Sequence, residues 1–267
     1  MTAELLKAAM HSRVYDLAHA LEPGIPIHPN HPPFFMSLHQ RFGDVVRSDG
    51  GSGANEVMVL SGHHATHVDA LGHMSCGGEV HGGITTDEAV DGAKGLRVHA
   101  ASDVPIFFSR GLCLDIARLR GRPLRAAEAV TAQDVEDALA AQELTIEPGD
   151  AVLVRTGWSQ YWREPDVFAG SRHGAPGPDL EAARLIADRG ATVTGTDTMA
   201  YEVFNPSVGE LPVHNHLLVE RGVPIVEMLD LEEIARDRIG SFLFVAAPLK
   251  LVGATGSPLR PLAIVGP

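Results

Sequence analysis

Histidines cluster in residues 61–83, which hold five of the fourteen in the chain. His63, His67 and Asp69 combine imidazole with carboxylate, which suits zinc or manganese, and His73 follows four residues later. On a helix, Asp69 would point about 240° away from His63 at roughly 100° per residue. In a straight strand His63 and His67 would stand about 13 Å apart at roughly 3.3 Å per residue. Binding of one ion by all three predicts a bent segment; the alternative is a solvated loop without metal.

A second group of candidate ligands lies late in the chain. It comprises His214, His216 and Glu227, and Glu227 interrupts the apolar stretch PIVEML. A carboxylate in an apolar strand is costly unless it is paired or bound to metal. The alternative, equally compatible with the residues, is that Glu227 points outward. Asp197 and Glu202 follow another expected strand, where acidic groups either line a site or cap a loop.

Short apolar stretches typical of strands must position these groups. They begin at residues 14, 56, 111, 151, 192, 224 and 242. Amphipathic patterns predict helices over 131–144, 178–190 and 231–239, the first with Thr131 as N-cap and Asp134 in a partial capping box. Without a linker or repeat, we expect one domain over residues 1–267, of the α/β (mixed α+β) class, with a mixed central sheet and flanking helices.

Composition excludes several classes of function. The formal net charge is −13, from 21 Lys and Arg against 34 Asp and Glu. Nucleic-acid binding is not expected, since it usually requires a basic stripe. No apolar run approaches the roughly 20 residues of a membrane span, and we expect no signal peptide. Cys76 and Cys113 are too few for a disulfide framework, which is typical of a cytoplasmic protein.

Aromatic residues offer candidates for contact with a small-molecule substrate. Trp158 belongs to RTGWSQYW, which follows an expected strand, and Phe34 belongs to the opening HPNHPPFF. Loops after strands commonly build pockets. The alternative for both groups is packing in the core, in an exposed arm or at an oligomer interface.

The chain resembles the cyclase-like metal-dependent hydrolases, which include bacterial kynurenine formamidases and isatin hydrolases. HHATHVDALGH is similar to their signature H-x-G-T-H-x-D-x-x-x-H. The resemblance covers nearly the whole chain through YDLAHALEPGIPIHP, AVLVRTGW, GTDTMAYE and VHNHLLVERGVPIVEML, in that order. It implies a fold of the swivelling β/β/α type and a homodimer or homotetramer.

The resemblance also implies a role for each motif residue. The protein would bind one or two divalent ions, zinc or manganese. The ligands would be His63, His67, Asp69, His214 and Glu227, and Asp69 would bridge the two ions. His214 is preferred over His216 because the family places its histidine three residues before the Leu-Leu pair. His73 would transfer protons. His64, next to a ligand, is expected to contact substrate or to face away.

Two residues depart from the family pattern, and both bear on substrate more than on metal. Ala65 replaces the usual glycine, so we expect its backbone to avoid strongly positive φ. Leu71 replaces a proline common in the formamidases, which makes the turn before His73 more flexible.

The implied chemistry is hydrolysis of a small cyclic or aryl amide, or of a lactone. A divalent ion lowers the pKa of bound water from about 15.7 to near 7, and the resulting metal-bound hydroxide would attack the carbonyl. His73, with an ordinary pKa near 6.5, suits proton transfer in both directions. Two alternatives stay open: a polyketide-type cyclase or lyase that uses the same metal site, and a non-catalytic metal- or ligand-binding protein.

Overall fold

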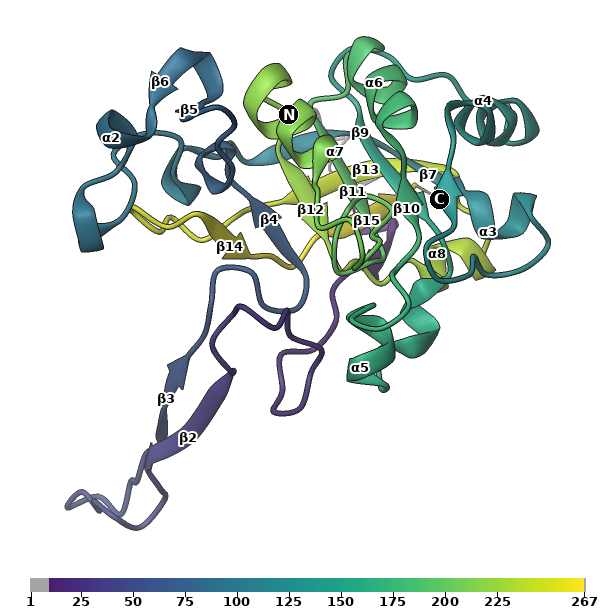
Figure 1. Cartoon of the computed structure of the whole chain (residues 1–267). Coiled ribbons are helices and arrows are strands. Elements are labelled where there is room, and N and C mark those ends of the chain that lie inside the picture. The colour runs from purple at the N-terminus through teal and green to yellow at the C-terminus, as the bar shows by residue number, and fades with distance from the viewer. Residues whose placement is uncertain (1–9, 267) are drawn as a thin grey trace.

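A nine-stranded mixed sheet forms the centre of the computed structural model, which describes residues 10–266 (Figure 1). Its strands, in spatial order, are β1 (Arg13–Asp16), β15 (Leu262–Val265), β13 (Ser241–Ala246), β7 (Phe107–Asp115), β9 (Ala151–Arg155), β11 (Val193–Thr196), β12 (Ile225–Glu227), β4 (His67–Asp69) and β14 (Gly256–Pro258). The four strands β7, β9, β11 and β12 run parallel, and the remaining pairs are antiparallel. The expected mixed sheet is confirmed.

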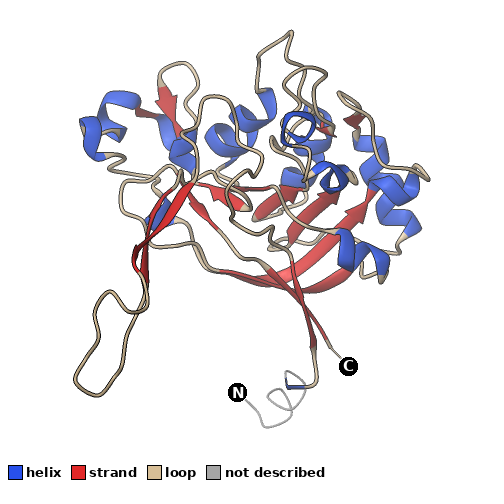
Figure 2. Cartoon of the chain, turned by 90° about the horizontal axis from the view of Figure 1, so that it is seen from below, coloured by secondary structure: helices blue, strands red, loops and turns tan. Residues whose placement is uncertain are grey.

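Most helices lie on one side of this curled sheet (Figure 2). They are α2 (Thr86–Ala89), α3 (Ile116–Leu119), α4 (Ala132–Ala141), α5 (Pro165–Phe168), α6 (Leu180–Asp188), α7 (Pro212–His214) and α8 (Glu232–Arg236). Single turns of 3-10 helix are η1 (Leu71–His73), η2 (His81–Gly83), η3 (Gly92–Lys94), η4 (Ala101–Asp103) and η5 (Trp158–Tyr161), and η6 (Asn215–Arg221) is a π-helix. No helix in the described part of the chain is long and apolar enough to cross a membrane.

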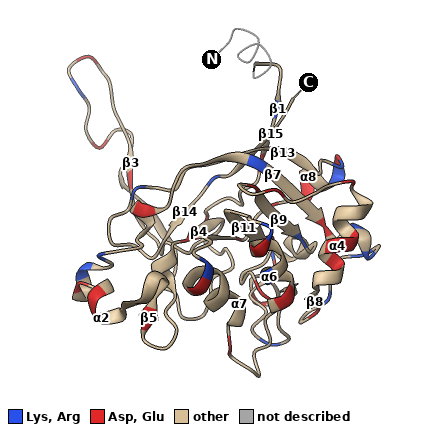
Figure 3. Ribbon diagram, turned by 90° about the horizontal axis from the view of Figure 1, so that it is seen from above, with Lys and Arg blue, Asp and Glu red and all other residues tan. Residues whose placement is uncertain are grey.

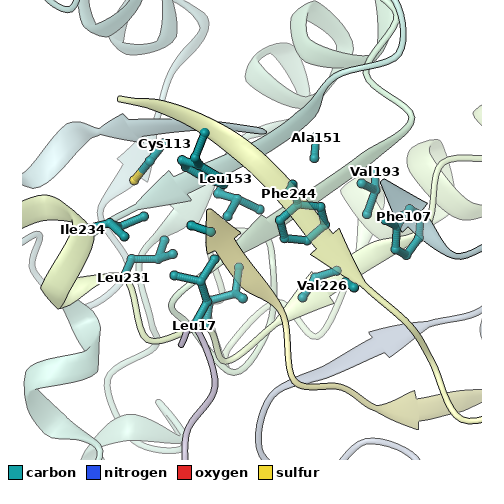
Figure 4. Close-up of a cluster of buried hydrophobic side chains, with 14 of the residues drawn as sticks. Leu17, Phe107, Cys113, Ala151, Leu153, Val193, Val226, Leu231, Ile234 and Phe244 are labelled. Atoms are coloured by element: carbon teal, nitrogen blue, oxygen red, sulfur yellow. The ribbon is translucent and has the colours of Figure 1, made fainter. Parts of the chain in front are cut away.

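The central strands are buried on both faces, which explains why they read as continuous apolar runs. In β9, Ala151 and Leu153 point to one core, which Figure 4 shows together with Cys113 and Phe244. The alternate residues of β9 point to a second core under α4 and α6. Side-chain alternation with a period of two therefore divides one strand between two hydrophobic layers.

The expected helices form with the expected start signals. Thr131 is the N-cap of α4, and its hydroxyl accepts a hydrogen bond from the backbone N–H of Asp134. The Asp134 carboxylate accepts one from the backbone N–H of Thr131, which completes the capping box. In α6 the Asp179 side chain caps the backbone N–H of Ala182. Such caps satisfy helix N–H groups that lack an intrahelical partner.

A hairpin of β2 (Phe35–Gln40) and β3 (Asn55–Val59) projects from the body as a long arm (Figures 1 and 2). The strand expected near residue 56 is therefore present, but it belongs to this arm and not to the central sheet. Two further small sheets pair β5 (Glu79–Val80) with β6 (Ile84–Thr85) and β8 (Ala129–Val130) with β10 (Gly177–Pro178). Figure 3 shows basic and acidic segments interspersed over the helices and loops.

Candidate metal centre and active site

Strand pairing brings the two groups of candidate ligands together. Strands β4 and β12 are antiparallel neighbours, with Glu227 opposite His67 and Ile225 opposite Asp69. Between Ser61 and His67 the chain is irregular, and after Asp69 it turns into η1, which ends at His73. This is the bent path that the spacing of the ligands predicts.

The ligand atoms form two groups that share one carboxylate. In the first, Nδ1 of His63 and Nε2 of His67 lie 2.7 and 3.3 Å from Oδ1 of Asp69. In the second, Nε2 of His214 lies 3.7 Å from Oδ2 of Asp69 and 3.2 Å from Oε1 of Glu227. Within each group the atoms are within 4.8 Å of one another, and all five residues are buried.

Unsatisfied polar atoms show that this donor set fits a divalent ion. Nε2 of His67 and Oδ2 of Asp69 are buried and have no hydrogen-bond partner among the described residues. An unpaired buried polar group typically costs about 1–3 kcal/mol. Nitrogen and carboxylate oxygen atoms at these positions are the ligands that zinc and manganese accept.

Each of the three histidines has its other ring nitrogen held by the protein. Nδ1 of His67 donates to the backbone oxygen of Ala65 over 2.8 Å. Nδ1 of His214 donates to Oε1 of Glu202 over 2.6 Å, and Nε2 of His63 lies 2.8 Å from the Thr255 hydroxyl. Such contacts orient a ligating imidazole and select its tautomer.

Charge compensation dominates the electrostatics of the centre. Burial opposes the charged form of His67, but the carboxylates of Asp69 and Glu227 outweigh it and raise the pKa of His67 to about 10. Burial likewise opposes the charge on Asp69, yet the direct contact with His63 helps to hold the pKa of that carboxyl well below its usual range. Opposite charges are thus held close together in a dry interior.

The two acidic residues after β11 have different roles. Asp197 accepts hydrogen bonds from the backbone N–H groups of Thr156, Gly157 and Trp158, so it caps a loop. Glu202 is the residue that belongs to the site, since it accepts hydrogen bonds from both the backbone and the ring of His214. Its position just past a strand was the sequence signal.

The expectation for Ala65 is wrong: its φ is +49°, in the left-handed region. This conformation costs an L-residue roughly 1–2 kcal/mol. Ala65 is buried against Ile25 and Phe34, and its carbonyl accepts the hydrogen bond from His67. These contacts hold Ala65 in this conformation.

His73 lies beside the candidate ligands, in the wall of a cavity of about 520 Å³. Its ring centroid is 4.2 Å from that of His63 and 6.4 Å from that of His214. Burial lowers the pKa of His73 to about 4, so the imidazole is neutral at physiological pH. A neutral imidazole facing a cavity is able to accept a proton.

The three residues expected to bind substrate are not among those that line this cavity. Phe34 packs in the cluster around Ala65. Nε2 of His64 donates to the backbone oxygen of Pro32, and its Nδ1 accepts from the backbone of Ser61. Trp158 is buried, and its indole N–H donates to the backbone oxygen of Phe168. Trp158 lines a separate cavity of about 790 Å³.

Residues that the sequence reasoning missed form the cavity wall instead. His28, Asn30 and His31 come from the stretch just before Phe34, where the HPNH pattern was a signal. The ring of His31 lies 5.4 Å from that of His63. His216 is buried on η6 and bonded to Glu220, so it belongs to neither ligand group.

Comparison with known proteins finds similar sequences over most of the chain. A family model described as "Putative cyclase" matches residues 15–203. The chain is 27% identical to an isatin hydrolase of Roseibium aggregatum, over 94% of this chain and 91% of that protein. It is 25% identical to a kynurenine formamidase of Paracidovorax citrulli, over 92% of this chain and 94% of that one.

Solved structures share the fold. A structure described as a novel cyclase superposes with a TM-score of 0.85 at 27% identity, covering 98% of this chain and 93% of that one. An isatin hydrolase bound to the product analogue thioisatinate has a TM-score of 0.76 at 22% identity, with both chains covered completely. At that identity the second likeness supports the fold alone.

Proposed function

The chain belongs to the family of putative cyclases, and on that premise we propose that it is a metal-dependent hydrolase that cleaves a small cyclic or aryl amide, or a lactone. Relatives named isatin hydrolase and kynurenine formamidase support this reaction class. The single observation that carries the proposal is the pair of ligand groups that share Asp69 at a cavity lined by His73.

The proposed ligands are His63, His67 and Asp69 for one ion, and Asp69, His214 and Glu227 for a second. Zinc or manganese fits these nitrogen and oxygen donors, and Asp69 would bridge the ions if both are bound. When bound, a divalent ion supplies a strong nucleophile from water at neutral pH and stabilises negative charge on a carbonyl oxygen.

His73 is the proposed proton-transfer residue. In its neutral form it accepts a proton from the attacking water and returns it to the nitrogen or oxygen that leaves. His67 and His214 cannot take this role, because their second ring nitrogens are held by Ala65 and Glu202 while Nε2 faces the carboxylates. His73 belongs to neither ligand group, which leaves it available for the proton.

A polyketide-type cyclase or lyase is the second candidate, supported by the family's own description. It would use the same metal site without consuming water. Mass spectrometry of the product separates the two, because hydrolysis adds the mass of one water and cyclisation does not. A non-catalytic binding protein would form no product at all. Such a protein has no need of His73 at the cavity.

The first test is the metal content per chain of protein purified without added metal, by plasma mass spectrometry. We expect one or two equivalents of zinc or manganese, lost in the double variant His63→Ala/His67→Ala. His216→Ala is the matched control, because it removes a buried histidine outside both ligand groups. A protein that stays empty after addition of zinc and manganese would rule out the hydrolase.

We also propose that the chain forms a homodimer or homotetramer in the cytoplasm. The hairpin of β2 and β3 supports this assembly, because it carries apolar side chains on both faces, and Phe42 beyond β2 is 77% exposed. An isolated two-stranded hairpin is marginally stable in water. Light scattering on Leu38→Ser/Met58→Ser should show a smaller particle than the parent, while Val252→Ser, on the body, should not change it. A parent that is already monomeric would contradict the proposal.

A further inference from the structure

The cavity that Trp158 lines, of about 790 Å³, shares no lining residue with the cavity beside the candidate ligands. We propose that it is a second binding site, for a small aromatic carboxylate, in which Arg125 and Arg172 bind the anionic group. Its volume is typical of pockets for small organic ligands. The site is independent of the proposed hydrolase, since none of its lining residues is a candidate metal ligand.

Two of the three arginines in this cavity have no side-chain partner among residues 10–266. Arg122 is paired with Glu128, and its two terminal nitrogens each lie 2.8 Å from a carboxylate oxygen. Arg125 and Arg172 are exposed, and neither guanidinium makes an ion pair or a hydrogen bond with a described residue. A guanidinium presents a planar fork of donors that matches the two oxygens of a carboxylate. These two groups are therefore available to bind an anion.

The charge balance of the wall favours a ligand with one carboxylate over a polyanion. Glu164 and Asp166 also line the cavity, and both are exposed. Because Glu128 neutralises Arg122, the wall lacks the large excess of positive charge that would attract a polyphosphate. A single carboxylate needs only one guanidinium fork, which the unpaired arginines supply.

Aromatic and aliphatic side chains form much of the remaining wall. The rings of Trp158 and Tyr161 are T-shaped neighbours, with centroids 4.7 Å apart. Pro123, Leu124 and Val167 add aliphatic surface. Such groups favour an aromatic ring, because its burial removes a large apolar area from water. The arginines thus account for the anionic group of the ligand, and these side chains account for its ring.

The loop that carries Arg172 has a closely packed backbone. Gly170 and Gly174 have positive φ, +65° and +82°, and the backbone N–H of Gly174 donates to the backbone oxygen of Gly170 over 2.8 Å. A Cβ on Gly174 would lie 2.2 Å from the backbone oxygen of Phe204. Ala175 and Phe204 exchange backbone hydrogen bonds of 3.1 and 3.0 Å. A backbone fixed in this way loses little conformational freedom when a ligand binds.

The same loop separates the two cavities. Ala169 and Ala175 line the cavity beside the candidate ligands, whereas Gly170, Arg172 and Gly174 line the second cavity. A molecule bound at Arg172 would therefore lie behind the wall of the candidate metal centre without contacting its ligands. This makes the second cavity an additional site and not an extension of the first.

Matched probes test the chemical class of the ligand. Calorimetry at constant ionic strength compares 2-naphthaleneacetate with 2-(2-naphthyl)ethanol, which has the same ring but no charge, and with acetate, which has no ring. We expect 2-naphthaleneacetate to bind at least tenfold more tightly than either of the others. Equal affinity for the alcohol would overturn the role of the arginines, and equal affinity for acetate would overturn the role of the aromatic wall.

Substitution of the unpaired arginines tests where the probe binds. Arg125→Gln/Arg172→Gln should weaken binding of 2-naphthaleneacetate at least tenfold, and both side chains are exposed, so we expect the variant to fold. Arg163→Gln is the matched control, because Arg163 is exposed and lines neither cavity. Parental affinity in the double variant would overturn the proposal. The single variants Arg125→Gln and Arg172→Gln should each show part of the loss.

Removal of metal distinguishes this site from the candidate metal centre, since a carboxylate is also a ligand for a divalent ion. The parent, treated with a chelator and then dialysed, should bind 2-naphthaleneacetate with unchanged affinity. Loss of binding on this treatment, together with parental affinity in metal-loaded Arg125→Gln/Arg172→Gln, would place the probe at the metal and overturn the proposal.

Discussion

His67 and Glu227 are direct cross-strand neighbours, and their Nε2 and Oε2 atoms lie 3.4 Å apart. On the same strands Val68 and Val226 point to the opposite face and pack in the core. Because side chains alternate, a register shift of one residue would place His67 opposite a core-facing valine. The pairing register of β4 and β12 thus builds the candidate centre.

Asp69→Asn should weaken both metal sites at once, since Asp69 belongs to both ligand groups. We expect at least a hundredfold loss of metal affinity and a lower thermal midpoint in metal-containing buffer, because energy of metal binding is also energy of folding. Metal titration and calorimetry measure the two effects. Asp166→Asn, at an exposed carboxylate, is the control. Full stoichiometry and unchanged affinity in Asp69→Asn would remove Asp69 from the ligands.

His73→Ala should separate turnover from metal binding. The ring lines the cavity but belongs to neither ligand group, so we expect metal content to stay at the parental level. Loss of a general acid–base group should lower kcat about 10²-fold or more. Steady-state kinetics on an amide or lactone hydrolysed by the parent provides the measurement. Normal hydrolysis by this variant would show that another group moves the proton.

Glu202→Gln tests whether Glu202 positions His214. The substitution keeps the shape of the side chain and removes the charge that accepts the Nδ1–H of His214. Loss of such an outer contact typically weakens metal binding about 10- to 100-fold, and we expect a loss in this range. Competition with a chelator measures the affinity, with the exposed Glu210→Gln as control. Unchanged affinity would mean that the hydrogen bond only supports the fold.

Glu128, which belongs to neither ligand group, provides a pH-dependent contribution to stability. Hydrogen bonds from Arg122 help to lower the pKa of Glu128 from its ordinary 4.5 to about 2. A depressed folded-state pKa contributes stability above the unfolded value, and this contribution is lost as the pH falls toward the folded value.

The parent should therefore exceed Glu128→Gln in unfolding free energy by about 1 kcal/mol at pH 7, a figure limited by solvent screening of the pair. The difference should shrink below pH 4.5. Urea unfolding at pH 7 and at acid pH gives both values. A difference that is independent of pH would assign the effect of the substitution to packing and not to charge.

Local sequence patterns predicted most strands of the central sheet and the longest helices, and they also pointed to the candidate ligands. The apolar run of β9 and the capping signal of α4 depend on side chains close in sequence, so they predict their elements directly. The unusual density of histidine and carboxylate in residues 61–73 likewise indicates metal chemistry before any folding is considered. The spacing also required the bend that separates His63 from β4.

Only the tertiary structure decided which side chains surround the site. His64 is held outside the cavity beside the candidate ligands by a backbone hydrogen bond, and Trp158 lines a separate cavity. Glu202 and His31 reach the centre because distant segments fold over it. Candidate ligands can be identified from residue type and short spacing in the sequence. The wall of a cavity depends on strand register and on the packing of loops that are far apart in sequence, and no local pattern encodes these.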